Sequence, residues 1–252
     1  MDITAIIQAR MTSTRLPAKI LMEVMGRPLL SYLIEQLGHS RLLSDIIIAT
    51  TTRREDNPVF NLAKQEGLKV YRGAEHDVLD RYYQTAREFD AGHIMRITAD
   101  CPLIQPDICD WVAKVYTNSR CDYTRTGESF AEGVDCEVFS REALNEAWKE
   151  AKRTSEREHV TLYLRNHPEI FRIMTLDNKS DDSRYRITVD EKEDFQVVRA
   201  VLENLYERSK PYIRIDDIKS FLDSHPEIYS INAHIIRNEG LIKPLQENKT
   251  IS

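Results

Sequence analysis

The fold is decided by the N-terminal stretch Ile3–Ile7 (ITAII), which runs directly into the loop Gln8–Lys19 (QARMTSTRLPAK). A continuous apolar run of this kind is typical of a buried parallel strand. Ligands in open α/β sheets bind at the carboxyl ends of such strands, where this loop lies. Arg10, Arg15 and Lys19 would be costly to crowd together without an anion between them, and guanidinium groups suit phosphate oxygens. The loop is therefore predicted to bind phosphate. Because it has no Walker or dinucleotide glycine pattern, a solvated surface turn is the alternative.

Composition narrows the class of protein. A chain of 252 residues with 41% hydrophobic content predicts one main domain, 1–252. The net charge of −6 argues against general affinity for nucleic acid. The four cysteines lack the short paired spacing of a zinc site, so reduced thiols in a cytoplasmic protein fit better than the alternative of structural zinc. We expect no membrane segment, since no apolar run approaches the roughly 18 residues that are needed to span a bilayer.

Hydrophobic periodicity predicts a regular first half. Helical spacing of apolar residues over 29–37 follows the loop, and a β-branched strand over 46–50 comes next. The same alternation predicts helices beginning near Asn57 and Asp77, and extended segments at 69–71 and 93–98. The fold class is therefore α/β, with a doubly wound, mostly parallel, Rossmann-like sheet.

The second half predicts a smaller mixed region beside this core. Short strands separated by long connections are not typical of a purely parallel sheet. The segment 127–164 is irregular, and we expect a dimer interface or an acceptor lid there. The predicted strands are 123–126, 134–139, 171–176 and 185–189, and the predicted helices are 106–116, 141–152, 156–165, 191–208 and 215–222.

Two carboxylates are placed to bind a metal. Asp100 follows the strand 93–98, and Asp190 follows the strand 185–189, so both lie at strand carboxyl ends. Mg²⁺ commonly takes only one or two protein carboxylates and fills its other positions with water and phosphate oxygens. Asp100 and Asp190 are therefore candidate Mg²⁺ ligands. A helix N-cap or a turn residue is the alternative for Asp100. An N-cap is the alternative for Asp190, and that role is compatible with metal binding.

The loop and both carboxylate segments resemble one family. Gln8-Ala9-Arg10-x-x-Ser13-x-Arg15-Leu16-Pro17-x-Lys19 is similar to the signature of the cytidylyltransferases that activate acidic sugars, including the acylneuraminate and 3-deoxy-manno-octulosonate enzymes. It is closest to the SpsF-like branch. Asp100-Cys101-Pro102-Leu103-Ile104 and Val189-Asp190-x-x-Glu193-Asp194-Phe195 resemble two further motifs, in family order. Ala18 stands where the family usually has glycine. Because alanine tolerates positive φ poorly, we expect right-handed or extended backbone there.

This resemblance implies a fold of the nucleotide-sugar-transferase type and a Mg²⁺-dependent reaction. A hydroxyl of an acidic sugar would attack the α-phosphate of CTP and expel pyrophosphate, in a cytoplasmic homodimer. Arg10, Lys19 and Asp100 would be the catalytic set, with the two cations on the triphosphate. Ala9, Ser13 and Arg15 would complete the nucleotide-binding loop, and Asp100 and Asp190 would carry the metal.

Three further segments resemble the SpsF-like branch. Arg72 and Asp77, from Arg-Gly-x-x-x-Asp-Val-Leu-x-Arg, are candidates for the nucleotide pocket, with helix capping and an Asp77–Arg81 pair as the alternative. Asp135 and Glu137 are placed near the acceptor, on one face of a strand. His159 is the histidine best placed to contact the acceptor, although such a residue is often a structural hydrogen-bonder.

Two other functions stay open on sequence alone. A nucleotide-sugar-dependent glycosyltransferase would use a related sheet, but Asp-x-Asp is then expected where Asp100-Cys101-Pro102 stands. The third possibility is a non-catalytic nucleotide-binding assembly partner. Retention of all three charged motifs counts against that reading.

Overall fold

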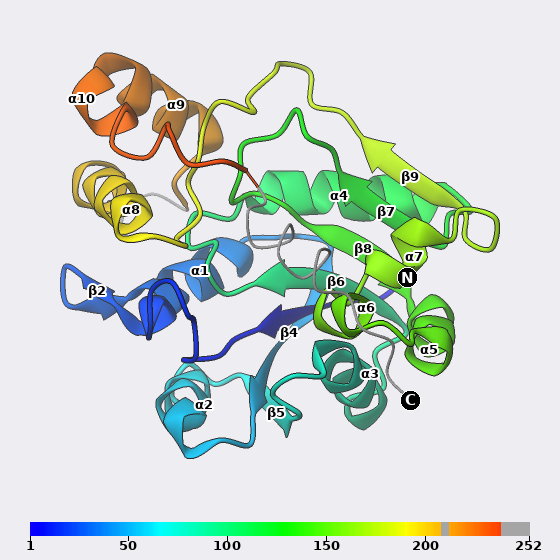
Figure 1. Ribbon diagram of the computed structural model, residues 1–252. Helices are drawn as coiled ribbons and strands as arrows, with labels where there is room; N and C mark the ends of the chain where they lie inside the picture. Colours follow the sequence, from blue (N-terminus) through cyan, green and yellow to red (C-terminus); the bar gives the residue numbers. More distant parts are fainter. Residues whose placement is uncertain (208–211, 238–252) are drawn as a thin grey trace.

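A seven-stranded sheet forms the centre of the computed structural model, which describes residues 1–207 and 212–237 (Figure 1). The strand order is β5 (Lys69–Gly73), β4 (Leu43–Thr51), β1 (Ile3–Gln8), β6 (His93–Thr98), β8 (Glu137–Ser140), β7 (Tyr123–Thr126) and β9 (Ile173–Leu176). β1 pairs in parallel with β4 and β6, and β4 pairs in parallel with β5, as the apolar runs predicted. β8 is antiparallel to both β6 and β7, which makes the sheet mixed at one side.

The connections place a topological switch point between β1 and β6. From β1 the chain moves outward through α1 (Leu29–Leu37) to β4, and through η2 (Arg54–Asp56) and α2 (Asn57–Gln65) to β5. It then returns through α3 (Val78–Glu88) to β6, on the other side of β1. Loops at such a point diverge and leave a crevice at the carboxyl edge of the sheet.

Helices cover both faces of the sheet. On one face, α1 and α4 (Pro106–Asn118) bury apolar residues such as Leu33 and Val112 against the strands. On the other face, Tyr82 of α3 and Leu144 of α5 (Arg141–Glu150) are fully buried, together with apolar residues of α7 (Leu162–Asn166). The predicted doubly wound α/β architecture is therefore confirmed.

A third apolar cluster joins the C-terminal helices to the N-terminal loop. Helices α8 (Lys192–Leu205), α9 (Ile215–Ser224) and α10 (Pro226–Tyr229) lie together at one end of the molecule (Figure 1). Their apolar side chains pack with Leu16 of the loop and with the hairpin of β2 (Glu23–Val24) and β3 (Arg27–Pro28). The loop is thus held by the core on one side. No helix within the described parts of the chain is long and apolar enough to cross a membrane.

Several predicted boundaries in the second half are wrong. The predicted strand 185–189 forms only a single bridge, between Arg186 and Glu132. The predicted strand 134–139 begins at Glu137, because Gly133 has φ +107° and lies against the backbone of Thr188, which bends the chain before the ladder starts. The predicted helix 156–165 is split into α6 (Thr154–Glu158) and α7, and α8 ends at Leu205. The predicted end of that last helix, Arg208, lies outside the described residues.

The expectation for Ala18 is also wrong, because its backbone is left-handed, with φ 61° and ψ 13°. This conformation costs an L-residue roughly 1–2 kcal/mol. Two hydrogen bonds hold it: the Ala18 N–H donates to the Met11 carbonyl at 3.0 Å, and the Ala18 carbonyl accepts from the Leu21 N–H at 2.9 Å. Ala18 therefore closes the loop directly before η1 (Lys19–Leu21).

Replacing Ala18 with glycine should stabilise the protein. Glycine adopts positive φ freely, so the substitution removes the backbone strain at this position. The energy released exceeds the additional backbone entropy that glycine loses on folding. We therefore expect Ala18→Gly to raise the free energy of unfolding by about 0.5–1 kcal/mol. Ala200→Gly, inside α8, is the matched control and should lower it by about 1 kcal/mol. Urea unfolding measures both. Equal destabilisation by the two substitutions would show that Ala18 is not strained.

Candidate functional site

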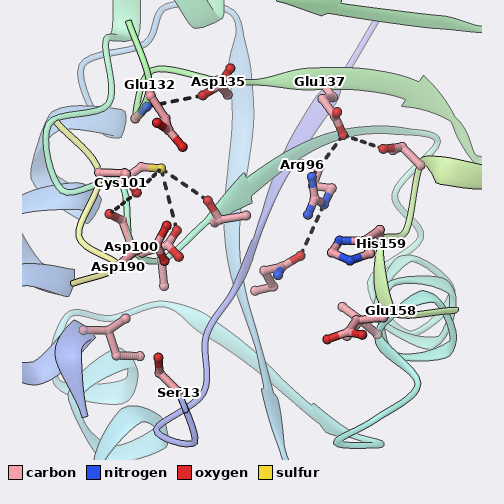
Figure 2. Close-up of a pocket in the computed structure, with 18 of the residues that line it drawn as sticks. Ser13, Arg96, Asp100, Cys101, Glu132, Asp135, Glu137, Glu158, His159 and Asp190 are labelled. Atoms are coloured by element: carbon pink, nitrogen blue, oxygen red, sulfur yellow. Dashed lines mark hydrogen bonds and ion pairs between the residues drawn. The ribbon is translucent and has the colours of Figure 1, made fainter. Parts of the chain in front are cut away.

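A cavity of about 480 Å³ opens at the carboxyl ends of β1 and β6 (Figure 2). Its wall is strongly charged and combines cations with carboxylates. The loop after β1 forms one side, and residues of β6, β7 and β8 form another. The charged lining residues are Arg10, Arg15, Lys19, Arg96, Arg125, Arg165, Arg237, Asp100, Asp135, Asp190, Glu128, Glu132, Glu137 and Glu158.

The loop is fixed from below by Asp56, a fully buried carboxylate of η2. The Met11 N–H donates to Asp56 Oδ1 at 2.7 Å, and the Thr51 hydroxyl donates to Oδ2. Within the loop, the Leu16 N–H donates to Ser13 Oγ at 3.4 Å. Nothing local in the sequence marks Asp56 for this role, because its contact with Met11 spans 45 residues. The result is a preorganised loop whose cations face the cavity.

Lys19 lies between the two predicted carboxylates. Its Nζ is 2.8 Å from Asp100 Oδ2 and 2.7 Å from Asp190 Oδ1, and the residue is only 8% exposed. Burial opposes charge on Lys19, but the two carboxylates outweigh it and raise the lysine pKa. Burial likewise acts to raise the pKa of Asp100, but the Lys19 ammonium holds it well below the ordinary value. Lys19 and Asp100 are thus both kept ionised in a confined space.

Neither carboxylate is used as a helix cap, which was the alternative for both. The N-cap of α4 is Gln105, and that of α8 is Glu191, which forms a capping box with Asp194. The Asp190 carboxylate instead contacts Arg15 at 2.9 Å, in addition to Lys19. Asp100 and Asp190, which are far apart in the sequence, therefore converge on Lys19. Figure 2 shows the two carboxylates side by side.

A buried ion network supports Asp190 from behind. Arg186 Nε donates to the fully buried Asp194 at 2.7 Å, and Arg186 Nη2 lies 3.4 Å from Asp190. Asp194 also accepts the Asp190 N–H at 2.9 Å and the Asn232 amide at 2.9 Å. Every oxygen of this carboxylate is therefore bonded, as a buried charge requires. The network fixes the backbone on which Asp190 sits.

The predicted acceptor residues Asp135 and Glu137 line the same cavity as Lys19. Glu137 accepts from Arg96 at 3.2 Å, from the Thr161 hydroxyl at 2.8 Å and from the Tyr123 hydroxyl at 2.9 Å. Asp135 pairs with Arg237 at 2.9 Å, yet burial raises the pKa of Asp135. Both carboxylates line the cavity, although only Glu137 belongs to a strand.

His159 lies between Arg96 and Glu158 in the cavity wall (Figure 2). Its Nε2 atom is buried and has no hydrogen-bond partner among the described residues. Burial lowers the pKa of His159 to about 4, so the ring is neutral near pH 7. His159 is therefore a hydrogen-bonding group rather than a cation.

Three residues predicted to bind nucleotide do not line the cavity. Arg72 donates to the carbonyls of Thr51 and Arg53, and Asp77 caps α3 by accepting the Asp80 N–H at 2.8 Å. Arg72 lies in β5 and Asp77 follows it, and β5 is an edge strand separated from β6 by β4 and β1. Both residues therefore make structural contacts outside the cavity, and a role in nucleotide binding stays a prediction. Ala9 is 2% exposed, and its N–H donates to the Ala49 carbonyl, which closes the sheet below the loop.

Asp77 pairs with Arg157 of α6 rather than with Arg81. Arg157 Nε lies 3.0 Å from both carboxylate oxygens, and Nη2 lies 2.5 Å from Oδ2. Arg81 instead donates to the Ala74 carbonyl at 2.6 Å. The predicted cap is confirmed, but the predicted intrahelical pair is wrong.

The metal-ligating potential of the site lies in Asp100 and Asp190. Among residues 1–207 and 212–237, no three His, Cys, Asp or Glu side chains come together in a metal-binding group. Two carboxylates that already converge on one cation nevertheless suit Mg²⁺, since that ion takes most of its ligands from water and phosphate.

Known proteins are similar to this chain in sequence and in fold. A family model described as cytidylyltransferase matches residues 4–238. The chain is 37% identical over 239 residues to the uncharacterized protein MJ1063 of Methanocaldococcus jannaschii, covering 93% of this chain and 96% of that protein. It is 31% identical over 233 residues to the spore coat polysaccharide biosynthesis protein SpsF of Bacillus subtilis, covering 90% and 96%. The solved structure of a cytidylyltransferase from Leptospira borgpetersenii superposes with a TM-score of 0.86 at 29% identity, covering 91% and 97%.

The structural role of Asp77 can be tested by a double-mutant cycle with Arg157. Asp77→Ala removes a helix cap and one partner of a bidentate pair, so we expect the free energy of unfolding to fall by about 1–3 kcal/mol. Arg157→Ala should cost a similar amount. The two losses should be less than additive by at least about 0.5 kcal/mol, because the residues share one interaction. Strict additivity in thermal or urea unfolding would contradict this assignment.

Proposed function

The chain belongs to the cytidylyltransferase family, and from that premise we propose that it transfers CMP from CTP to an acidic sugar and releases pyrophosphate. The product would be an activated sugar for polysaccharide or glycoconjugate synthesis. One observation carries the proposal: Lys19, Asp100 and Asp190 meet beside a preorganised cationic loop in a single cavity. A triphosphate and a divalent cation have complementary charges for these groups.

In the proposed reaction, a hydroxyl oxygen of the acceptor attacks the α-phosphorus of CTP. A new P–O bond forms between the acceptor oxygen and the α-phosphorus, the bond from the α-phosphorus to the bridging oxygen breaks to release pyrophosphate, and the hydroxyl proton passes to solvent. Negative charge then builds on the equatorial and leaving oxygens. Transfers of this kind depend on positioning and on charge stabilisation rather than on a protein nucleophile.

The loop cations supply that positioning. Arg10 and Arg15 both line the cavity. Arg10 contacts Glu158 at 3.9 Å, whereas Arg15 contacts Glu191 at 3.4 Å and Asp190 at 2.9 Å. The long Arg10 pair is weak, so a phosphate can replace Glu158 at little cost. Lys19 is the third cation, and Ser13 holds the turn between them. These groups would bind the triphosphate.

Asp100 and Asp190 would hold Mg²⁺, and the ion would supply charge neutralisation on the phosphate oxygens and help to ionise the acceptor hydroxyl. The Lys19 ammonium lies between the same two carboxylates, so it competes with the ion for them. We infer that nucleotide phosphates draw Lys19 away from the pair. Metal affinity is then coupled to the presence of CTP.

The proposed reaction is tested by pyrophosphate release with CTP and a panel of sugar acids. Asp100→Asn should lower turnover by about 100-fold or more while the chain stays folded, because it removes charge stabilisation at the reacting phosphate. Asp107→Asn, an exposed change on α4, is the matched control and should retain activity. Wild-type turnover in Asp100→Asn would remove Asp100 from the site. Hydrolysis of a nucleotide sugar without use of CTP would favour a glycosyltransferase instead.

The competition by Lys19 predicts a change in metal binding that needs no turnover. Without CTP, Lys19→Ala should bind Mn²⁺ at least about 10-fold more tightly than the wild type, because two adjacent carboxylates lose their neutralising cation. Electron paramagnetic resonance of free Mn²⁺ measures this affinity. Lys64→Ala, on α2, is the control and should leave it unchanged. Unchanged affinity in Lys19→Ala, or a gain that survives Asp100→Asn, would contradict the competition.

A further inference from the structure

A segment from the C-terminal part of the chain returns to the cavity and contacts one of its loops. After α10 the backbone turns back toward the middle of the molecule (Figure 1). Arg237, in this segment, lines the cavity together with residues of the β7–β8 loop, which covers 127–136. Arg237 and Asp135 of that loop are 102 residues apart in the sequence, so no local pattern links them.

The Arg237 guanidinium joins three points of the β7–β8 loop. Its Nη1 donates to the Glu128 carbonyl at 2.8 Å and to the Phe130 carbonyl at 2.6 Å, and its Nη2 donates to Asp135 Oδ1 at 2.9 Å. Glu128 and Phe130 belong to the limb of the loop that follows β7, whereas Asp135 belongs to the limb that precedes β8. One side chain therefore ties both limbs together, through the rigid fork of donors that a guanidinium offers.

The backbone of this loop also has anchors that do not involve Arg237. The Ser129 carbonyl accepts from the Asp182 N–H at 2.8 Å. Glu132 donates its N–H to the Tyr185 carbonyl at 2.9 Å and accepts from the Ile187 N–H at 2.8 Å. These bonds hold the middle of the loop against the segment 182–187. Loss of the Arg237 guanidinium should therefore leave the loop folded and act mainly on the Asp135 side chain.

Asp135 presents its carboxylate to the cavity. Its side chain is 41% exposed, and Oδ2 accepts from the Gly133 N–H at a long 3.3 Å (Figure 2). Burial raises the pKa of Asp135, the Arg237 guanidinium opposes this rise, Glu137 adds to it, and Arg125 opposes it from further away. Both effects fit a concave wall, which surrounds the carboxylate with protein but leaves it open to a ligand. The charge and the direction of Asp135 thus depend on Arg237.

We propose that Arg237 is a positioning residue, which holds the Asp135 carboxylate at the cavity wall as a hydrogen-bond acceptor for hydroxyl groups of the acceptor sugar. The inference rests on the proposed function for the identity of this ligand. Each carboxylate oxygen accepts more than one hydrogen bond, so Asp135 keeps lone pairs for a ligand while it is paired with Arg237. A carboxylate held in one orientation binds a sugar at a lower entropic cost than a freely rotating one.

Steady-state kinetics of pyrophosphate release, with an acceptor that the wild type uses, tests this role. Arg237→Gln should raise the KM for the acceptor at least about 5-fold and leave the KM for CTP within about 2-fold, because Asp135 loses its orientation while the loop after β1 is untouched. Arg237→Lys should recover part of the loss, since it restores charge without the guanidinium fork. Arg172→Gln is the matched control. It breaks an Arg–Asp pair of the same 2.9 Å length, with Asp122 and outside the cavity, and should change neither KM.

A double-mutant cycle separates positioning from an independent contact. Asp135→Asn alone should raise the KM for the acceptor, and adding Arg237→Gln to it should change that KM by less than about 2-fold, because Arg237 acts through Asp135. Circular dichroism shows whether each variant is folded.

The pKa of Asp135 provides a second readout, which needs neither CTP nor an acceptor. Carbon-13 NMR of the aspartate carboxyl carbons measures it, and the signal is assigned by its absence in Asp135→Asn. Arg237→Gln should raise this pKa, because the carboxylate loses its paired cation. Arg172→Gln should leave it unchanged.

Three kinetic outcomes overturn the role of Arg237 while the proposed function stands. They are a wild-type KM for the acceptor in Arg237→Gln, an equal rise in both KM values, and effects of Arg237→Gln and Asp135→Asn that multiply in the double variant. If no acceptor leads to consumption of CTP, the proposed function fails, and the NMR titration then decides the contact. A raised pKa of Asp135 in Arg237→Gln would support the hold of Arg237 on this carboxylate, and an unchanged pKa would overturn it.

Discussion

The ammonium of Lys19 is the contact on which the rest of the structure depends. It joins the loop after β1 to Asp100 after β6 and to Asp190 before α8, across 81 and 171 residues of sequence. Taking three charges out of water costs several kcal/mol per ion, and only close and well-bonded pairing offsets that cost. The site therefore forms when the N-terminal loop, the centre of the sheet and the C-terminal helices are all in place. The contacts of Lys19 therefore determine the geometry of the cavity and also hold these three parts of the fold together.

Two buried carboxylates fix the backbone on either side of the Lys19 contact. Asp56 holds the loop through a backbone N–H, and Asp194 holds the backbone of Asp190 in the same manner. Both carboxylates are fully buried, and both act on the backbone rather than on the cavity. Charged groups at the cavity wall are thus positioned by buried groups behind them. This division directs Arg10, Arg15 and Lys19 toward the cavity while the loop itself stays fixed.

The sequence predicted the structure correctly where it depends on local periodicity, or on the rule that ligands bind at the carboxyl ends of parallel strands. Apolar runs predicted β1, β4, β5 and β6, and the rule that ligands bind at strand carboxyl ends brought Asp100 to the loop. Arg72 and Asp77 lie at the end of β5 and directly after it, but β5 is at the sheet edge, and strand order is not visible in the periodicity. The antiparallel insertion of β8 could not be foreseen either. Without it, the neighbours Arg96, Glu137 and Arg125 are unrelated positions.

At Ala18, tertiary contacts outweigh the preference of alanine for negative φ. Its left-handed backbone costs roughly 1–2 kcal/mol, which propensity alone would avoid. The next residue is Lys19, and a different backbone at Ala18 would direct the ammonium away from both carboxylates. Leaving Asp100 without its cation in a confined site would cost about 3–5 kcal/mol, which exceeds the strain. The chain therefore keeps alanine in a conformation suited to glycine, because the pairing of Lys19 with the two carboxylates contributes more free energy than the backbone strain at Ala18 costs.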